Sequence, residues 1–174
     1  MAWEKGVLLS IHAAAHPFLD ALFLFSHQVG TIQFGIVLVL LMTLWHAARR
    51  DRRAALVWLV VGVLTALLQS QLKSFFGRPR PELWPRLIQP VGEAWPSGHA
   101  LSTATFFPLL AWHAAARWPR RAVLAWSVAA ALVLYVGVGR LYLGVHWPTD
   151  VLGGWLIALP QVLVAVRLMR RAVP

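Results

Sequence analysis

The sequence predicts an all-α membrane protein, a polytopic helical bundle with five clear transmembrane helices and an N-terminal helix that is either interfacial or a sixth span. Three observations support this prediction. Hydrophobic residues make up 59% of the 174 residues and charged residues only 13%, whereas a soluble domain carries about 25% charged residues. Several apolar runs approach the roughly 20 residues that a helix needs to cross the hydrocarbon core. Strand periodicity is absent, and a helical bundle satisfies the backbone groups for which lipid offers no partner.

The five clear spans are expected at residues 32–48, 54–75, 100–116, 122–138 and 151–166. Because little sequence separates them, we expect a single domain over residues 1–174, with its motifs between residues 73 and 150.

The N-terminal 30 residues are less regular. Residues 3–16 form an amphipathic pattern, and the short apolar run at 17–30 is interrupted by Asp20, His27 and Gln28. This pattern fits one tilted sixth span with a kink at Pro17, or two short helices at the membrane interface.

Basic residues are concentrated on one side of the predicted topology. Ten arginines follow the first span, the third span and the last span: Arg49, Arg50, Arg52, Arg53, Arg117, Arg120, Arg121, Arg167, Arg170 and Arg171. Short loops rich in Lys and Arg stay in the cytoplasm. We therefore expect a multi-pass protein of the inner (plasma) membrane, with the 76–98 loop and the 139–146 turn on the periplasmic or extracellular face. The net charge of +10 does not indicate nucleic acid, because the basic residues lie at span ends and form no continuous stripe.

A second set of polar and charged residues lies on the opposite, external side of the predicted topology. It forms three sequence motifs: Lys73 with Arg80 and Pro81; Pro96, Ser97, Gly98 and His99; and Arg140, His146 and Asp150. A phosphoryl group in transfer spreads negative charge over three oxygens, which fixed cations stabilise. Lys73, Arg80 and Arg140 supply such cations, and the arginines can donate two hydrogen bonds each to one phosphate.

The other motif residues suit the same chemistry. Ser97 and Gly98 precede an apolar helix, where a serine can cap free amides and a glycine lets the backbone approach an anion. Asp150 lies about one helical turn beyond His146, so its carboxylate can fix the tautomer of the imidazole and leave the other nitrogen free to attack phosphorus. The chain has only six acidic residues and no cysteine, so we expect neither a metal site nor a cofactor.

These three groups resemble the tripartite signature of the type 2 phosphatidic acid phosphatase and vanadium haloperoxidase superfamily. The resemblance covers close to half of the chain. It implies that His146 is the nucleophile, that Asp150 orients it and that His99 donates a proton to the leaving oxygen. One departure is Gly139, where the family usually has a serine before the arginine. We expect the bonding around the phosphate site to be weakened or rearranged there.

The resemblance implies a lipid phosphatase, with a membrane lipid as its partner. Undecaprenyl diphosphate is the first candidate substrate, and phosphatidylglycerophosphate, phosphatidic acid, diacylglycerol diphosphate and lipid A phosphates are alternatives. A phosphotransferase, a vanadium haloperoxidase and a non-catalytic lipid transporter or binding protein remain competing hypotheses. Arg78 and Arg86 could bind the lipid headgroup, a second phosphate or anionic lipid. The sequence does not specify the oligomeric state.

Overall fold

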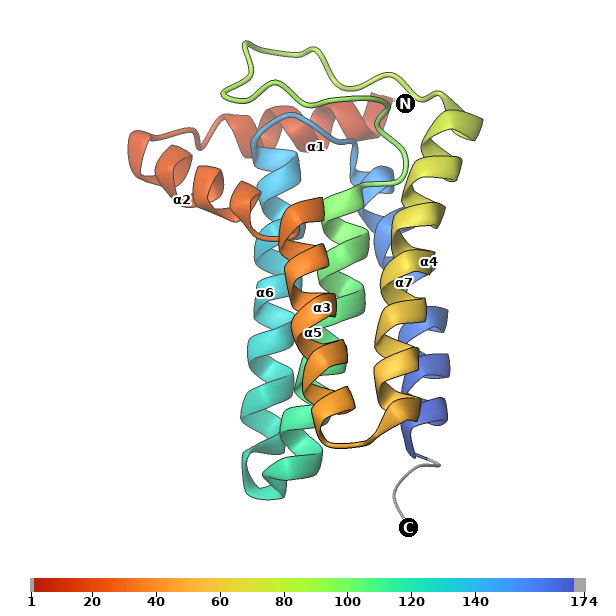
Figure 1. Cartoon of the computed structure of the whole chain (residues 1–174). Coiled ribbons are helices and arrows are strands. Elements are labelled where there is room, and N and C mark those ends of the chain that lie inside the picture. The colour runs from red at the N-terminus through yellow and green to blue at the C-terminus, as the bar shows by residue number, and fades with distance from the viewer. Residues whose placement is uncertain (1, 171–174) are drawn as a thin grey trace.

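The computed structural model describes residues 2–170, which fold into seven α-helices and one short 3-10 helix. Five of the helices stand side by side as a bundle, and the first two lie across one end of it (Figure 1). The bundle consists of α3 (Ile32–Ala48), α4 (Arg52–Phe76), α5 (Gly98–Arg117), α6 (Ala122–Tyr142) and α7 (Pro148–Arg170), with η1 (Pro119–Arg121) between α5 and α6. The predicted all-α class is confirmed.

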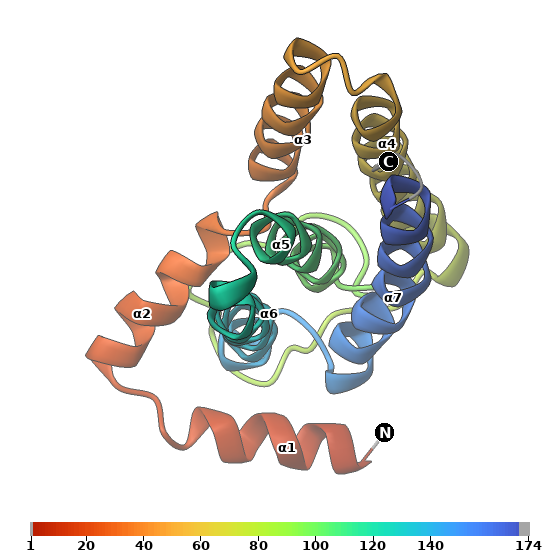
Figure 2. The same ribbon diagram turned by 90° about the horizontal axis from the view of Figure 1, so that it is seen from below.

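Three helical segments are long and apolar enough to cross a membrane, namely α4, the segment Pro119–Tyr142 and α7. The first two helices would add a fourth span if they are counted as one bent segment. Two of the predicted spans lie outside this group, since α3 has only 17 residues and α5 is less apolar. Figure 2 shows why α5 differs, because it lies inside the ring of other helices and faces protein. Its Ser102, Thr103 and Thr105 are buried in that interior.

The N-terminal segment forms two helices, α1 (Ala2–His12) and α2 (Pro17–Gln28), which meet at an angle of 119°. The bend follows from the sequence between them. Pro17 occupies the first turn of α2, a position that suits its fixed φ and missing N–H. Nδ1 of His16 accepts the N–H of Phe18 at 3.2 Å, which caps the new helix. The segment therefore corresponds to two short helices and not to one kinked helix.

The two ends of the bundle differ in chemistry. One end carries α1, α2, the long loop after α4 and the turn between α6 and α7, whereas the α3–α4 connection, η1 and the end of α7 lie at the other (Figure 1). The arginines predicted for the cytoplasmic side belong to this second end, except Arg171, which lies outside the described residues. The predicted separation of the arginine clusters from the motif residues is therefore present in the fold.

Close packing between α5 and α7 fixes the end of the bundle where the motifs meet. A Cβ at Gly154 would lie 2.8 Å from the carbonyl oxygen of Ser97 and 2.9 Å from the amide nitrogen of Leu101. Glycine thus lets the second turn of α7 and the start of α5 approach at backbone distance. Deeper in the bundle, the hydroxyl of Thr65 in α4 donates to Oε1 of Gln161 in α7 at 3.0 Å.

Candidate active site

The three motifs meet at the end of the bundle that α1 and α2 cross. Lys73 lies in the last turn of α4, and Arg80 follows in the loop. Ser97 caps α5, whose first turn carries His99, and Arg140 lies in the last turn of α6. His146 belongs to the turn between α6 and α7, and Asp150 to the first turn of α7. The packing of the helices brings residues that are up to 77 positions apart to one end of the fold.

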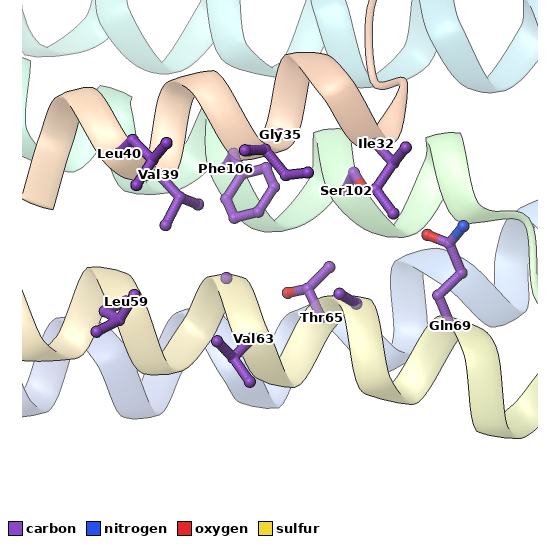
Figure 3. Close-up of a pocket in the computed structure, with 13 residues that line it drawn as sticks. Ile32, Gly35, Val39, Leu40, Leu59, Val63, Thr65, Gln69, Ser102 and Phe106 are labelled. Carbon is purple, nitrogen blue, oxygen red and sulfur yellow. The ribbon is translucent and has the colours of Figure 1, made fainter.

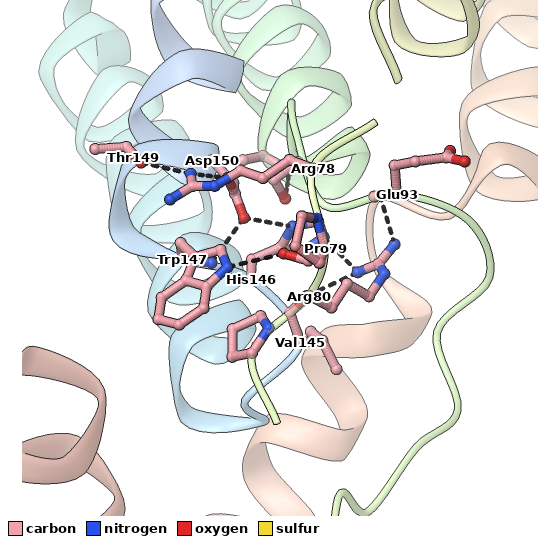
Figure 4. A network of polar contacts seen from close by, with 12 residues as sticks. Arg78, Pro79, Arg80, Glu93, Val145, His146, Trp147, Thr149 and Asp150 are labelled. Carbon is pink, nitrogen blue, oxygen red and sulfur yellow. Dashed lines mark hydrogen bonds and ion pairs between the residues drawn. The ribbon is translucent and has the colours of Figure 1, made fainter. Parts of the chain in front are cut away.

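His146 is held between a carboxylate and a guanidinium (Figure 4). Its Nδ1 lies 3.4 Å from Oδ2 of Asp150, and its Nε2 lies 3.2 Å from Nη1 of Arg80. A guanidinium can only donate and a carboxylate can only accept. The hydrogen of the neutral imidazole therefore belongs on Nδ1, and the lone pair of Nε2 faces the cationic side of the site.

Asp150 owes its orientation to the start of α7. Its Oδ2 accepts the backbone N–H of Trp147 at 2.7 Å, in the manner of an acidic residue that caps the first turn of its own helix. The side chain is fully buried. A buried carboxylate with fixed partners gives His146 one defined orientation.

Lys73 and Arg80 make most of their contacts with the backbone of the loop between α4 and α5. Nζ of Lys73 donates to the carbonyl oxygen of Glu93 at 2.5 Å, and Nη2 of Arg80 donates to the same oxygen at 3.1 Å. Arg80 also donates to the carbonyl oxygens of Gly92 at 2.7 Å and of Val145 at 2.7 Å. Several carbonyls thus hold the guanidinium of Arg80 beside Nε2 of His146, and Lys73 is joined to Arg80 through the shared carbonyl oxygen of Glu93.

Burial lowers the pKa of His146 from its ordinary 6.5 to about 4. The positive charges of Arg80 and Lys73 lower the pKa further, while the carboxylate of Asp150, 3.4 Å from Nδ1, opposes them. The imidazole is consequently neutral near pH 7, which is the form that can act as a nucleophile.

Arg78 connects Asp150 to the N-terminal helix. Nη1 of Arg78 donates to Oδ1 of Asp150, and Nη2 donates to Oε2 of Glu4 at 2.8 Å. The other oxygen of Glu4 accepts the hydroxyl of Thr149 at 2.6 Å. Glu4 is fully buried. Arg78, which the sequence suggested for the headgroup, is thereby placed behind the His146–Asp150 pair.

Sequence reasoning assigned no role to Glu4 or Thr149. The only available signal was an acidic residue in the amphipathic N-terminal helix, and this signal was weak because the same helix also carries Lys5 and His12. The partner, however, lies 74 positions away in the chain and is set only by the fold.

His99 and Arg140 meet on the other side of the site, at the end of α2. Nε2 of His99 donates to the backbone carbonyl of His27 at 3.1 Å, and the two imidazole rings stack with centroids 5.0 Å apart. Nη1 of Arg140 lies 2.9 Å from Nδ1 of His27, and Nη2 donates to the hydroxyl of Ser26 at 3.1 Å. Arg140 is 1% exposed. Neither Ser26 nor His27 was predicted as a site residue, because a lone histidine in an apolar helix usually packs in the interior.

Backbone hydrogen bonds join the His146–Asp150 side of the site to the side that holds His99 and Arg140. The N–H of Ser97 donates to the carbonyl of Asp150 at 3.0 Å, and the N–H of Val145 donates to that of Arg140 at 3.2 Å. Oγ of Ser97 caps the amide of Ala100, and a Cβ at Gly98 would lie closer than 3.0 Å to the carboxamide of Gln69 in α4. The α5 N-terminus is therefore tightly enclosed among the motif residues.

Arg86 lies apart from this arrangement. Its Nε donates to the carbonyl oxygen of Pro81 at 3.0 Å, and its guanidinium lies 3.7 Å from the exposed carboxylate of Glu82. Both partners belong to the same loop. The structure thus brings together all the predicted catalytic and phosphate-binding residues, but it leaves Arg86 beside them in the loop.

A multi-helix membrane bundle whose cationic site surrounds a carboxylate-paired histidine defines a membrane phosphatase. Residues 53–174 match the model of the PAP2 superfamily, and the chain belongs to this superfamily. It is accordingly a PAP2-type membrane lipid phosphatase.

Three relatives illustrate the similarity. The chain is 29% identical over 146 residues to phosphatidylglycerophosphatase B of Bacillus subtilis, an alignment that covers 82% of this chain and 71% of the relative. It is also 29% identical over 146 residues to undecaprenyl-diphosphatase of Sulfolobus acidocaldarius, covering 80% of this chain and 65% of that protein. The crystal structure of a transmembrane PAP2-type phosphatidylglycerolphosphate phosphatase from Bacillus subtilis superposes with a TM-score of 0.88 at 24% identity, covering 98% of this chain and 86% of that one.

Proposed function

We propose that this protein hydrolyses a lipid phosphate or diphosphate through a phosphohistidine intermediate on His146, without a metal ion. The observation that carries the proposal is the orientation of His146. Its Nδ1 faces Asp150 at 3.4 Å and its Nε2 faces the guanidinium of Arg80 at 3.2 Å. A phosphate held by Arg80 would place its phosphorus within reach of the Nε2 lone pair.

The first step forms a bond between Nε2 of His146 and phosphorus and breaks the bond from phosphorus to the lipid oxygen. Burial and the charge of Arg140 lower the pKa of His99 when no anion is bound. The negatively charged phosphate raises that pKa as it binds, so His99 gains a proton and gives it to the leaving oxygen. Because Nε2 of His99 donates to the carbonyl of His27, Nδ1 is the nitrogen that serves the substrate. Lys73, Arg80, Arg140 and the amides at the start of α5 stabilise the charge on the equatorial oxygens.

The second step hydrolyses the phosphohistidine. His99, now neutral, takes a proton from a water molecule whose oxygen attacks phosphorus, and the bond to Nε2 of His146 breaks. Inorganic phosphate leaves, and both histidines return to their starting protonation states. Asp150 holds the Nδ1 hydrogen of His146 in both steps. The phosphotransferase hypothesis differs only in the acceptor, since an alcohol would replace the water.

An apolar cavity beside the site supports a lipid as substrate. A cavity of about 220 Å³ lies between α3 and α4 and is lined mainly by aliphatic side chains (Figure 3). Gln69 lines this cavity, and its carboxamide is also the group that a Cβ at Gly98 would meet. The cavity therefore adjoins the start of α5, where an acyl or prenyl chain could lie while its phosphate occupies the site.

Undecaprenyl diphosphate is our first proposed substrate, and the likeness to the Sulfolobus acidocaldarius undecaprenyl-diphosphatase supports it. Phosphatidylglycerophosphate is the second candidate, supported by the likeness to the Bacillus subtilis phosphatidylglycerophosphatase B. Phosphatidic acid and lipid A phosphates complete the set. The cationic residues bind the phosphate, which all these lipids share. The fit of the acyl or prenyl chain to the cavity determines which lipid is preferred.

The test measures phosphate release by detergent-purified protein from undecaprenyl diphosphate, phosphatidylglycerophosphate, phosphatidic acid and lipid A, with EDTA present. We expect release by the wild type and by His113→Gln, a histidine of α5 distant from the motifs, but not by His146→Ala. With a ³²P-labelled substrate, a rapid quench should trap an acid-labile label on the protein. Binding of the lipids by folded protein without any release would favour a transporter or binding protein over the enzyme.

We also propose that the site faces the periplasm or cell exterior. The support is the arginine clustering at the opposite end of the bundle, because short arginine-rich loops are retained in the cytoplasm. The chain contains no cysteine, so single cysteines at Arg50 and Gln89 can report each end. A membrane-impermeant thiol reagent added to intact cells should label Gln89→Cys alone, and labelling of Arg50→Cys alone would reverse the orientation.

A further inference from the structure

The space beside Gly139 is filled by a side chain from another helix. Gly139 lies in α6 directly before Arg140, and a Cβ built there would lie closer than 3.0 Å to Oγ of Ser26 in α2. Ser26 is fully buried. A serine at position 139, which the family resemblance leads one to expect, would therefore place its side chain in the volume that the Ser26 hydroxyl already occupies.

The Ser26 hydroxyl has a defined bonding pattern. It donates to the backbone carbonyl of Phe23 at 2.6 Å and accepts from Nη2 of Arg140 at 3.1 Å. Its single hydrogen is used by Phe23, so its lone pair is directed at the guanidinium. His27 occupies the neighbouring Nη1 at 2.9 Å. Consecutive residues of α2 thus hold the two terminal nitrogens of one buried arginine.

The remaining nitrogen of the Arg140 guanidinium indicates where a ligand would bind. Nε of Arg140 is buried and has no hydrogen-bond partner among the described residues, although a buried donor without a partner is costly. The guanidinium is anchored at its outer nitrogens by α2 and keeps further N–H groups for an anion. Fixing this plane in advance lowers the entropy that phosphate binding would otherwise cost.

We propose that Ser26 is a positioning residue for Arg140. Its hydroxyl, which belongs to α2, replaces the hydroxyl that a serine at position 139 of α6 would supply. The proposal deepens the proposed function, on which it rests, by making the N-terminal helix pair part of the phosphate site. Ser26 contacts no reacting atom in this scheme and acts only through the guanidinium of Arg140.

The test moves the hydroxyl from α2 back to α6. Ser26→Ala should lower kcat/KM for the lipid phosphate by about tenfold or more, because it removes a hydrogen bond to a charged group. The double variant Ser26→Ala with Gly139→Ser should recover most of this loss. Once Oγ of Ser26 is absent, the nearest atoms to the new Cβ are Cδ1 of Phe23 and Cβ of residue 26, both at 3.2 Å, which small shifts can accommodate.

Two further variants separate the hydroxyl from the volume it fills. Ser26→Ala with Gly139→Ala restores the volume without the hydroxyl and should stay impaired. Gly139→Ser alone places two side chains in one space and should be impaired as well. Gln28→Ala, an exposed polar residue of the same helix, is the matched control and should behave as the wild type.

A second readout distinguishes this proposal from the proposed function. Inorganic phosphate should raise the thermal unfolding temperature of the detergent-purified wild type, with a weaker effect in Ser26→Ala and a restored effect in Ser26→Ala with Gly139→Ser.

A wild type that binds phosphate in this way but releases none from any lipid would refute the proposed function alone. Wild-type kcat/KM and phosphate binding in Ser26→Ala would overturn the role of Ser26. Equal recovery by serine and alanine at position 139 would also overturn it, and this comparison stands even if Ser26→Ala alone fails to fold.

Discussion

Nη1 of Arg80 lies 3.2 Å from Nε2 of His146, so the cation that we expect to bind phosphate also faces the nitrogen that we expect to attack it. One contact thus combines two requirements of phosphoryl transfer, an oriented nucleophile and a positive charge where the equatorial oxygens develop negative charge. Burial is the main reason that the pKa of His146 is lowered, and the charge of Arg80 lowers it further because a nearby cation disfavours the imidazolium.

The pH dependence of hydrolysis follows from the protonation state of His146. The pKa of His146 is lowered to about 4, and the protonated ring cannot attack phosphorus. The acid limb of kcat/KM should therefore lie near pH 4 and not near 6.5. Arg80→Gln removes a charge that lowers this pKa, so its residual activity should show an acid limb at higher pH. Profiles of kcat/KM between pH 3 and 8 measure both shifts, and an acid limb near 6.5 in the wild type would contradict the assignment of His146.

Asp150→Asn should lower kcat on the order of 10²–10⁴-fold with little change in the volume of the side chain. The amide can present a donor to Nδ1 of His146, which favours the wrong tautomer. Steady-state phosphate release measures the loss. Asp20→Asn is a suitable control, because Asp20 accepts the hydroxyl of Tyr142 at 2.6 Å and has no role in the proposed steps; a comparable fall in that variant would mean that the loss of charge acts through general stability.

Glu4→Gln should destabilise the fold and lower activity together. Glu4 is fully buried, and its carboxylate holds Arg78 at 2.8 Å and Thr149 at 2.6 Å. An amide nitrogen would face one of these donors, and breaking a buried ion pair costs about 3–5 kcal/mol. Thermal unfolding in detergent should show a lower midpoint than in Lys5→Gln, an exposed neighbour on the same helix. Equal midpoints would show that the Glu4–Arg78 pair adds nothing to the fold.

Gly98→Ala should impair activity, and Gln69→Ala should partly restore it. The added Cβ at residue 98 overlaps the Gln69 carboxamide, and overpacking of this kind costs about 1–3 kcal/mol. Because the obstruction is the end of a flexible side chain, its removal relieves the clash. Phosphate release by the two single variants and the double variant measures the coupling. Additive losses would place the defect elsewhere, for example in the approach of the phosphate to the amides of α5.

Filling the cavity between α3 and α4 should affect lipid substrates selectively. Val63 lines this cavity, and Val63→Trp would occupy space that we assign to an acyl or prenyl chain. We expect kcat/KM to fall about tenfold for the lipid phosphate but to change little for a short, water-soluble phosphate ester. Leu134→Trp, on an exposed face of α6, controls for bulk in the membrane-facing surface. An equal fall for both substrates would indicate distortion of the site and not exclusion of the chain.

The fold class and the grouping of the motif residues at one end of the bundle were accessible from the sequence because both depend on local patterns. Apolar runs bounded by arginines predict helices and their connections whatever the partners of each helix are. His146 and Asp150 lie within one turn of each other along the chain, so their contact followed from spacing alone. The span count was less accessible: α5 is enclosed by other helices, and the sequence does not reveal which helix is central.

The partners that hold the site residues were decided by the tertiary structure. Glu4 meets Arg78 across 74 positions, and Ser26 meets Arg140 across 114. These contacts depend on how α1 and α2 cross the end of the bundle, and the bend of 119° between them fixes that path. The sequence by itself thus determined the membrane bundle and the residue types of the proposed phosphate site. Only the tertiary structure determined that the carboxylate of Glu4 holds Arg78 and that the hydroxyl of Ser26 holds Arg140. Each pair forms between segments that are far apart in the chain, and the local periodicity of a helix does not specify where another segment packs against it.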